Sequence, residues 1–298
     1  MCINMSRAHP IVAVTGASGA GTTSVQEAFK SICADAKFDA VFVEGDSFHR
    51  YEREEMRKLI DAWERTAGRT ISHFGPEANL FGELETLFTE YGERGMGRAR
   101  QYLHNEDAAR LHGQKVGTFT EWSDITPDSD LLIYEGLHGG IVTDAVNISQ
   151  HVDLLIGVTP TINLEWIQKL YRDQKDRGHS IDDVTQTILR RMPDYIEYIV
   201  PQYSRTHINF QRVPTVDTSN PFSNTGIPSP NESLIVVRFN DPNQQEIEDI
   251  INAVGGSFQS KEDCIVVPGQ TFEQTLKFIL SPRVQKLVTN GREERNHK

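Results

Sequence analysis

The sequence predicts an α/β fold, a three-layer sandwich with helices on both faces of a mixed, mainly parallel sheet. Short apolar runs alternate with segments whose apolar residues recur at helical spacing, and this alternation is typical of parallel strands joined by crossover helices. The first apolar run leads into a cluster of glycines, and two later runs each end in a carboxylate. Such positions lie at the edge where open parallel sheets bind ligands.

The first two thirds of the chain supply the parallel part of this prediction. A strand precedes the glycine cluster, and Val25, Ala28, Phe29 and Ile32 lie on one face of the helix that follows it. A second strand and helix repeat the pattern. The predicted strands are Ile11–Val14, Ala40–Val43, Leu131–Tyr134 and Leu154–Val158, followed by helices at Asn163–Gly178 and Asp182–Met192 with Pro193 and Pro201 as breakers.

The whole chain, residues 1–298, is expected to form a single domain with two additions. Residues 66–122 are polar and rich in Gly and Arg, which predicts helices and loops inserted to serve a substrate. Residues 208–298 are expected to extend the same sheet. Their predicted strands are Phe210–Asp217, Leu234–Phe239 and Cys264–Val267, and their predicted helices are Asn243–Ala253 and Phe272–Leu280.

Composition excludes several classes of function. The chain has 30 Lys and Arg against 42 Asp and Glu, a net charge of -12, which disfavours nucleic acids and anionic membranes as partners. Its 3 cysteines show neither disulfide nor zinc spacing. No apolar run approaches the ~18 residues of a membrane span. These features favour a cytoplasmic protein.

The glycine cluster predicts a phosphate-binding loop of the P-loop NTPase type. Between a strand and a helix, glycines let backbone N–H groups surround a phosphate, whereas the alternative is a purely structural turn. Thr22 stands where such loops carry a lysine, so another cation must stabilise the transferred phosphoryl group. Thr23 retains a hydroxyl for Mg²⁺. The predicted ATP-binding residues are Gly16, Ala17, Ser18, Gly19, Ala20, Gly21, Thr22 and Thr23.

Carboxylates at strand ends are the candidates for catalysis and for Mg²⁺ binding. Kinases use one carboxylate to deprotonate or orient the acceptor hydroxyl and others to hold the metal. We assign the base to Asp46, which also contributes to the metal site, and the metal role to Glu135. Glu44 is the competing carboxylate. The alternative role for Asp46 is that of a helix N-cap or turn residue.

A basic helix can replace the missing lysine. Lys169, Arg172, Asp173 and Arg177 share one face of a predicted helix, although such a run is also typical of a solvated surface. We expect Lys169 and Arg172 to stabilise the transferred phosphoryl group. His49 and Arg53 lie one helical turn apart after Asp46, a spacing suited to binding a phosphate beside the base or, alternatively, to a surface pair. For His104 with Arg94, Arg98 and Arg100, the alternatives are an exposed basic loop and part of a sugar-phosphate pocket.

Several segments together resemble the bacterial phosphoribulokinases over nearly the whole chain. They are the phosphate loop, Val43-Glu44-Gly45-Asp46-Ser47-Phe48-His49-Arg50, Tyr134-Glu135-Gly136-Leu137-His138-Gly139-Gly140, Asn163-Leu164-Glu165-Trp166-Ile167-Gln168-Lys169 and Phe210-Gln211-Arg212-Val213-Pro214-Thr215-Val216-Asp217-Thr218-Ser219-Asn220-Pro221-Phe222. The resemblance implies a P-loop kinase domain that transfers the γ-phosphoryl group of ATP to O1 of D-ribulose 5-phosphate, giving D-ribulose 1,5-bisphosphate for carbon fixation in the Calvin cycle.

The resemblance also implies roles for individual residues. Asp46 is the base, Glu135 the acidic residue for Mg²⁺ and nucleotide, and Lys169 and Arg172 lie near the transferred phosphoryl group, with Asp173 as a further active-site carboxylate. The residues matched to the sugar phosphate are His49, Arg53, His104 and Arg177. The bacterial family accepts Thr at the position of Thr22.

Regulation is a further implication of the resemblance. Ala20 stands where plant-type relatives carry a regulatory cysteine, so no thiol switch is expected there. Bacterial members are often octamers activated by NADH and inhibited by AMP, which implies a homo-oligomer, up to an octamer, with NADH as allosteric activator. Arg191 and Arg238 are candidates for the effector site.

Two other functions stay open at the level of sequence. One is a uridine or pantothenate kinase acting on a non-phosphorylated alcohol, although such enzymes usually retain the P-loop lysine. The other is a nucleotide-binding regulator without catalysis, which Thr22 favours and which Asp46 and the basic helix disfavour.

Overall fold

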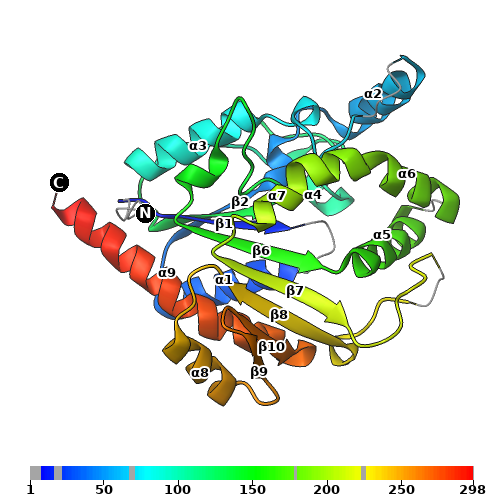
Figure 1. Cartoon of the computed structure of the whole chain (residues 1–298). Coiled ribbons are helices and arrows are strands. Elements are labelled where there is room, and N and C mark those ends of the chain that lie inside the picture. The colour runs from blue at the N-terminus through cyan, green and yellow to red at the C-terminus, as the bar shows by residue number, and fades with distance from the viewer. Residues whose placement is uncertain (1–7, 17–21, 67–70, 178–179, 223–225, 298) are drawn as a thin grey trace.

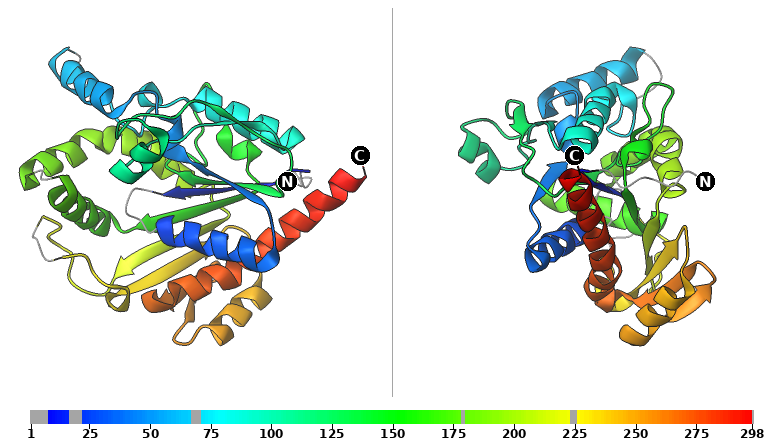
Figure 2. Two further views of the ribbon diagram at one scale, coloured as in Figure 1. Left: turned by 180° about the vertical axis from the view of Figure 1, so that it is seen from behind. Right: turned by 90° about the vertical axis from the view of Figure 1, so that its left-hand side faces the viewer.

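The computed structural model describes residues 8–16, 22–66, 71–177, 180–222 and 226–297. The side chains of residues 22, 23, 64–66, 176 and 177 also lie outside the description. An eight-stranded sheet runs through the molecule in the order β2-β5-β1-β6-β7-β8-β10-β9 and carries helices on both faces (Figures 1 and 2). The α/β fold and the mixed, mainly parallel sheet are confirmed.

Five strands form the parallel part of the sheet. β1 lies at its centre, paired in parallel with β5 on one side and β6 on the other, while β2 pairs with β5 and β7 with β6. β1, β5 and β6 are continuous apolar runs because helices cover both of their faces. The strands are β1 (Ile11–Gly16), β2 (Ala40–Glu44), β5 (Leu131–Gly136), β6 (Leu154–Pro160) and β7 (Ile208–Pro214).

The C-terminal strands extend the same sheet in antiparallel pairing. β8 (Ser233–Phe239) pairs with β7, β10 (Cys264–Pro268) with β8, and β9 (Phe258–Lys261) with β10 at the edge. β7 ends three residues before the predicted Asp217. β9 escaped prediction because all four of its residues are exposed, so its sequence lacks the apolar alternation of a half-buried strand.

The two faces of β1 pack into different cores. Val12 and Val14 face α1 (Thr22–Ala36), α8 (Gln244–Ala253) and α9 (Phe272–Asn296). Ile11 and Ala13 face α3 (Phe81–Arg94). This alternation follows from the two-residue period of a strand, and the layers appear in Figure 2.

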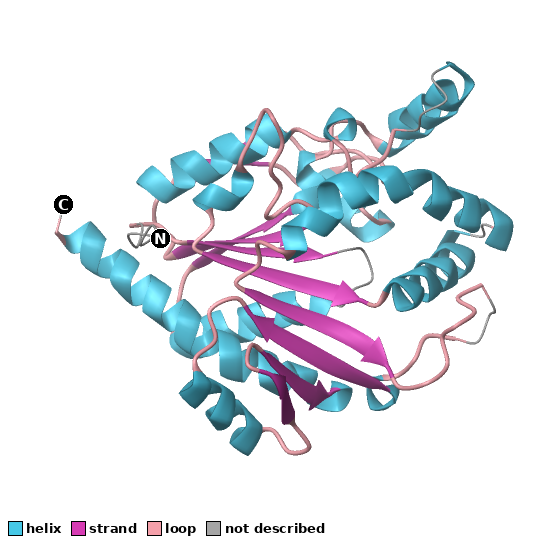
Figure 3. Ribbon diagram, viewed as in Figure 1, coloured by secondary structure: helices cyan, strands magenta, loops and turns pink. Residues whose placement is uncertain are grey.

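Most of the remaining helices lie at the carboxyl ends of the parallel strands. Figure 3 shows the β6 and β7 arrowheads pointing to the side occupied by α5 and α6, and α2 projects from the body (Figure 1). A short hairpin pairs β3 with β4 in the inserted region. These elements are α2 (Arg53–Thr66), β3 (Gly97–Ala99), α4 (Glu106–His112), β4 (Ser123–Ile125), α5 (Ile162–Arg177), α6 (Ile181–Asp194) and α7 (Val200–Tyr203).

The prolines expected to break helices do not do so. Pro193 lies inside α6, and a π-helical turn at Tyr195–Ile199 leads directly into α7, which contains Pro201. A π-helical turn is wider than an α-helical one, so the helix can continue beside a proline, which has no backbone N–H to donate. Likewise α9 continues past Leu280 to Asn296 with Pro282 inside it, because Leu276, Leu280, Val284 and Val288 form one unbroken buried stripe.

The ends of β2 and β5 approach each other unusually closely. A Cβ atom on Gly136 would lie 2.7 Å from the Cα of Gly45, and one on Gly45 would lie 2.5 Å from the hydroxyl of Tyr134. Glycine is therefore required at both positions, directly after Glu44 and Glu135. Among the described residues, no helix has the length and apolarity needed to cross a bilayer.

Candidate active site

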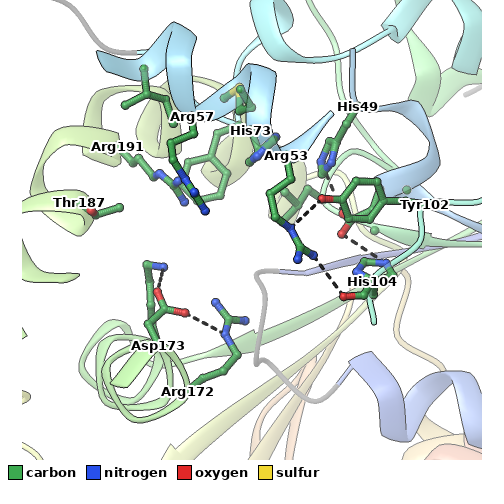
Figure 4. A pocket seen from close by; sticks show the side chains of 18 of the residues that line it. His49, Arg53, Arg57, His73, Tyr102, His104, Arg172, Asp173, Thr187 and Arg191 are labelled. Carbon is green, nitrogen blue, oxygen red and sulfur yellow. Dashed lines mark hydrogen bonds and ion pairs between the residues drawn. The ribbon is translucent and has the colours of Figure 1, made fainter. Parts of the chain in front are cut away.

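A large cleft opens at the carboxyl ends of β2 and β5, bordered by α2, α5 and α6 (Figure 4). Its volume is about 1320 Å³, enough for a nucleotide and a second small molecule. Of the residues predicted from sequence, it is lined by Gly16, Asp46, His49, Arg53, His104, Glu135, Lys169, Arg172 and Asp173. Segments more than a hundred residues apart in the chain thus meet in one cavity.

Asp46 lies in a short turn, the 3₁₀ helix Gly45–Phe48 that follows β2, between two imidazoles. Its Oδ1 is 3.5 Å from Nε2 of His49, and its Oδ2 is 3.8 Å from Nε2 of His104. The same Nε2 of His104 is 3.5 Å from Oε2 of Glu44. The carboxylates and imidazoles therefore form one continuous polar cluster.

The two imidazoles differ in their tendency to hold a proton. Burial lowers the pKa of His49, against the attraction of Asp46. The hydrogen bond with Glu44 raises the pKa of His104, with further attraction from Asp46, and the same hydrogen bond lowers the pKa of Glu44. At neutral pH this arrangement favours a neutral His49 and promotes a cationic His104.

Arg53 begins α2 and reaches the same cluster. Its Nε donates to the hydroxyl of Tyr102 at 3.3 Å and its Nη2 to the carbonyl oxygen of His104 at 3.2 Å (Figure 4). His73 stacks on His49 with ring centroids 4.1 Å apart. Asp46 is thus surrounded by groups that can donate hydrogen bonds to an anionic substrate.

Glu135 follows the buried run of β5 and pairs in register with Glu44 of β2. Neighbouring residues of a parallel pair project to the same face, so both carboxylates belong to the same edge of the cleft. Among the described side chains, no group of three or more His, Cys, Asp and Glu forms a ready-made metal site. Oxygen donors such as Asp46 and Glu135 nevertheless fit Mg²⁺, which proteins usually bind through one or two carboxylates plus substrate phosphates.

The basic face of α5 lies on another wall of the cleft. Lys169 Nζ donates to Asp173 Oδ2 at 2.6 Å, and Arg172 Nε donates to Asp173 Oδ1 at 3.2 Å. Burial, followed by repulsion from Arg191, lowers the pKa of Lys169 to about 8. Asp173 is only 4% exposed, so its buried carboxylate fixes the two cations in place.

Glu165 lies one helical turn before Lys169 and was not singled out from the sequence. Burial raises its pKa to about 7, and its Oε2 accepts a hydrogen bond of 3.0 Å from the Tyr195 hydroxyl. Tyr195 opens the π-helical turn. Such turns are frequent at functional sites.

Gln202 of α7 ties this turn to the strand ends and was also missed. The side chain is fully buried. Its Oε1 accepts from the Thr15 hydroxyl and the Gly140 amide, and its Nε2 donates to the carbonyls of Leu137 and Tyr198. No sequence pattern marks this glutamine, because Thr15, Gly140 and Leu137 lie far away along the chain.

The structure does not describe every residue of the predicted site. Residues Ala17, Ser18, Gly19, Ala20 and Gly21 are not described, nor are the side chains of Thr22, Thr23 and Arg177. Of the residues on either side, Gly16 lines the cleft and α1 begins at Thr22.

The structure adds basic residues to the cleft and places other arginines at the surface. Arg57, Arg190 and Arg191 line the cleft; a spacing of four residues after Arg53 could have indicated Arg57. Arg94 and Arg98 lie on the surface, as the basic-loop alternative expects, 3.6 Å from Glu90 and 3.7 Å from Asp124 respectively. Arg238 donates to the Tyr203 carbonyl and the Thr206 hydroxyl.

The geometry suits transfer of an anionic group to a hydroxyl. A carboxylate available as a base faces one wall of the cleft, and paired cations that can neutralise a transferred phosphoryl group stand on another. Gly16, the last residue of β1, lines the same cavity.

Comparison with known proteins agrees with this arrangement. Residues 11–219 match the model of the phosphoribulokinase / uridine kinase family. The chromosomal phosphoribulokinase of Cupriavidus necator is 54% identical over 95% of this chain and 97% of its own length. That of Nitrobacter vulgaris is 50% identical over 95% and 98%, and a probable phosphoribulokinase of Escherichia coli is 53% identical over 95% and 98%.

A solved structure gives the same result for the fold. The phosphoribulokinase from Rhodobacter spheroides superposes with a TM-score of 0.88 at 45% identity, covering 95% of this chain and 99% of that one. The similarity therefore includes the C-terminal antiparallel strands as well as the segment matched by the family model.

Proposed function

The chain belongs to the phosphoribulokinase / uridine kinase family and is a kinase, and from this premise we propose that it phosphorylates D-ribulose 5-phosphate at O1 with ATP, giving D-ribulose 1,5-bisphosphate and ADP. The observation that carries the proposal is the group of basic side chains around Asp46. His49, His104 and Arg53 contact or approach the cluster around this carboxylate, so an acceptor that itself carries a phosphate can be held beside the base.

In the proposed mechanism Asp46 accepts the proton of the O1 hydroxyl. The freed oxygen attacks the γ-phosphorus, the bond from that phosphorus to the β,γ-bridging oxygen breaks, and ADP leaves with the electron pair. Lys169 and Arg172, held by Asp173, neutralise charge on the transferred group, the task that a P-loop lysine performs elsewhere.

Residues Gly16–Thr23 would bind the ATP phosphates, and Arg177 would join His49, Arg53 and His104 in binding the sugar phosphate. Thr23, Asp46 and Glu135 would hold Mg²⁺, which supplies charge neutralisation at the β- and γ-phosphates. Support for the metal role comes from the chemistry of these oxygen donors.

The wider parts of the proposal concern organisation and regulation. We propose one kinase domain over residues 1–298, with the region 66–122 serving the acceptor and residues 208–298 extending the sheet. We also propose a cytoplasmic homo-oligomer, up to an octamer, that NADH activates. Arg191 and Arg238 remain candidates for the effector site, although Arg191 lines the cleft.

The test is a coupled assay of ADP release with ATP, Mg²⁺ and ribulose 5-phosphate, run beside uridine, pantothenate and fructose 6-phosphate. Selective turnover of ribulose 5-phosphate is expected, and addition of NADH tests activation in the same experiment. Turnover of uridine or pantothenate alone would reassign the acceptor. Absence of turnover with every acceptor would favour a nucleotide-binding regulator.

A further inference from the structure

Arg100 does not line the cleft, yet it binds the backbone of the turn that carries Asp46 and His49. Its Nε donates to the carbonyl oxygen of Ser47 at 2.9 Å, and its Nη2 donates to that of His49 at 2.6 Å. One planar guanidinium therefore spans two carbonyls of a single short turn, a geometry that a lysine ammonium cannot reproduce.

Aromatic rings fix the guanidinium of Arg100. Its Cζ lies 3.7 Å from the ring centroid of Phe119 and 4.8 Å from that of Trp122. Trp122 in turn contacts Phe48 of the turn edge to face, with ring centroids 5.7 Å apart. The arginine is held by rings of the inserted region and binds the turn through its N–H groups.

The backbone around Arg100 is itself well supported. Gln101 and Leu103 exchange hydrogen bonds with the segment Gly117–Thr120, and Tyr102 forms a bridge with Phe119. Along this extended segment Arg100, Tyr102 and His104 follow at intervals of two residues, which places them on one side. Tyr102 binds Arg53, and His104 approaches Glu44 and Asp46.

Backbone hydrogen bonds close the end of the turn and join it to residues 78–80. The amide of His49 donates to Asp46, that of Arg50 to Ala78, and that of Leu80 to Phe48. The carbonyls of Ser47 and His49 receive their side-chain hydrogen bonds from Arg100. A turn of this kind can shift if that support is removed.

We propose that Arg100 is a positioning residue that clamps the turn Gly45–His49 and thereby sets where Asp46 and His49 stand relative to the acceptor. The consequence for turnover rests on the proposed function, whereas the clamp itself does not. A misplacement of about 1 Å in a catalytic group can reduce turnover roughly 100-fold. The expected signature is a lower kcat with little change in ATP binding, because the nucleotide is held by other elements.

The experiment compares Arg100→Lys with Arg98→Gln as a matched control from the same segment. Arg98 is exposed and pairs with Asp124 at the surface. Two readouts are taken on the full chain: hydrogen exchange of the amides in residues 46–50, and steady-state kinetics. For Arg100→Lys we expect faster exchange, a kcat reduced about 10- to 100-fold and a KM for ATP within about 2-fold of wild type. Arg98→Gln should match wild type in both.

A second variant, Trp122→Leu, removes a ring that contacts both the guanidinium and Phe48 of the turn, and it leaves the residues that form the two hydrogen bonds of Arg100 unchanged. It should change both readouts in the same direction by a smaller factor. A folded Arg100→Lys protein with unchanged exchange and unchanged kcat would overturn the proposal. So would a loss of kcat accompanied by an equal rise in the KM for ATP and a matching loss of thermal stability, since that pattern indicates general damage.

The two proposals fail in distinguishable ways. A wild-type protein that does not phosphorylate ribulose 5-phosphate contradicts the proposed function, and the exchange measurement still decides whether Arg100 clamps the turn. A wild-type protein that is active, together with an Arg100→Lys protein equal to it in both readouts, contradicts the clamp alone.

Discussion

Charged side chains in the cleft are held by polar or oppositely charged partners. Asp173 is buried and binds both Lys169 and Arg172, while Asp46 has imidazoles on two sides. A buried charge that loses its partner is costly. Variants at this site should therefore conserve shape and change one charge at a time.

Asp46→Asn keeps the shape of the side chain but removes the proposed base. We expect kcat to fall about 10²- to 10⁴-fold, the usual contribution of general base catalysis. ATP affinity, measured by calorimetric titration, should stay within about 2-fold of wild type, because the proposed base acts on the acceptor and the other proposed Mg²⁺ ligands, Thr23 and Glu135, are unchanged. Asp107→Asn, a change at an exposed surface pair with Arg110, serves as control. An unaltered kcat in Asp46→Asn would remove Asp46 from the mechanism.

Lys169 gives a prediction about pH. Its pKa of about 8 means that the amine loses its proton above pH 8, so kcat should decline there. Lys169→Met should lower kcat about 10²- to 10³-fold, more than it weakens ATP binding, and abolish this alkaline decline. Lys175→Met, on the same helix beside the Tyr171 ring, should retain both the rate and the decline.

The lowered pKa of Lys169 also makes the free energy of unfolding depend on pH. Since the pKa of Lys169 falls from 10.5 to about 8 on folding, the unfolded chain binds more protons between these values. The contribution of this group to stability therefore increases as pH rises through that window. If the alkaline decline in kcat persisted in Lys169→Met, another group would be responsible for it.

How far the site was predictable depends on the kind of contact each residue makes. Asp46 and Glu135 follow apolar strands, and Lys169, Arg172 and Asp173 share a helix face, so local pattern identified them as residues of the cleft. Arg100 binds backbone carbonyls 51 and 53 residues away, and Gln202 binds backbone groups of Gly140 and Leu137, 62 and 65 residues away. Tertiary contacts of that kind leave no periodic signal in the sequence.

Among the elements, the ends of β2 and β5 show why some local patterns were informative. Both strands end in Glu-Gly, and the two glycines allow the chains to come within van der Waals contact. The buried runs predicted the strands. The π-helical turn at Tyr195–Ile199 was not predictable, because Pro193 and Pro201 ordinarily end helices. Tertiary contacts, among them those of Glu165 and Gln202, stabilise the continuous path.

Gly136→Ala tests this close approach. The new Cβ would lie 2.7 Å from the Cα of Gly45 and 2.8 Å from the Tyr134 hydroxyl, so the end of β2 and the turn after it must shift. We expect a loss of about 1–3 kcal/mol in the free energy of unfolding and a kcat reduced at least about 10-fold, measured by denaturant titration and the ADP-release assay. The matched control is Gly82→Ala in α3, where the Cβ meets no atom within 4 Å. Equal stability of the two variants would show that the ends of β2 and β5 are not tightly packed.

For the whole molecule, Asp130 at the start of β5 connects parts of the chain that are far apart in sequence. Its carboxylate accepts hydrogen bonds from Arg292 Nε at 2.7 Å and Arg292 Nη2 at 2.6 Å, with Arg295 at 3.2 Å. It also accepts from the Asp39 amide just before β2, and Arg295 binds the carbonyl of Ala8. The long helix α9 is thereby fixed to the amino-terminal edge of the sheet, away from the cleft.

Asp130→Asn should therefore reduce stability without impairing catalysis. Burial alone would raise the pKa of Asp130, but the hydrogen bonds from Arg292 and the Asp39 amide lower it. This stabilisation is present above the ordinary pKa of the carboxyl and is lost as pH falls through the lowered value. We expect a loss of about 1–3 kcal/mol in the free energy of unfolding at neutral pH, measured by denaturant titration. The difference from wild type should shrink as pH is lowered, and the KM values should not change.

The control is Glu90→Gln, which removes the surface partner of Arg94 and should cost less than about 1 kcal/mol in the free energy of unfolding. If Asp130→Asn behaved like Glu90→Gln, α9 would be held by its apolar stripe alone.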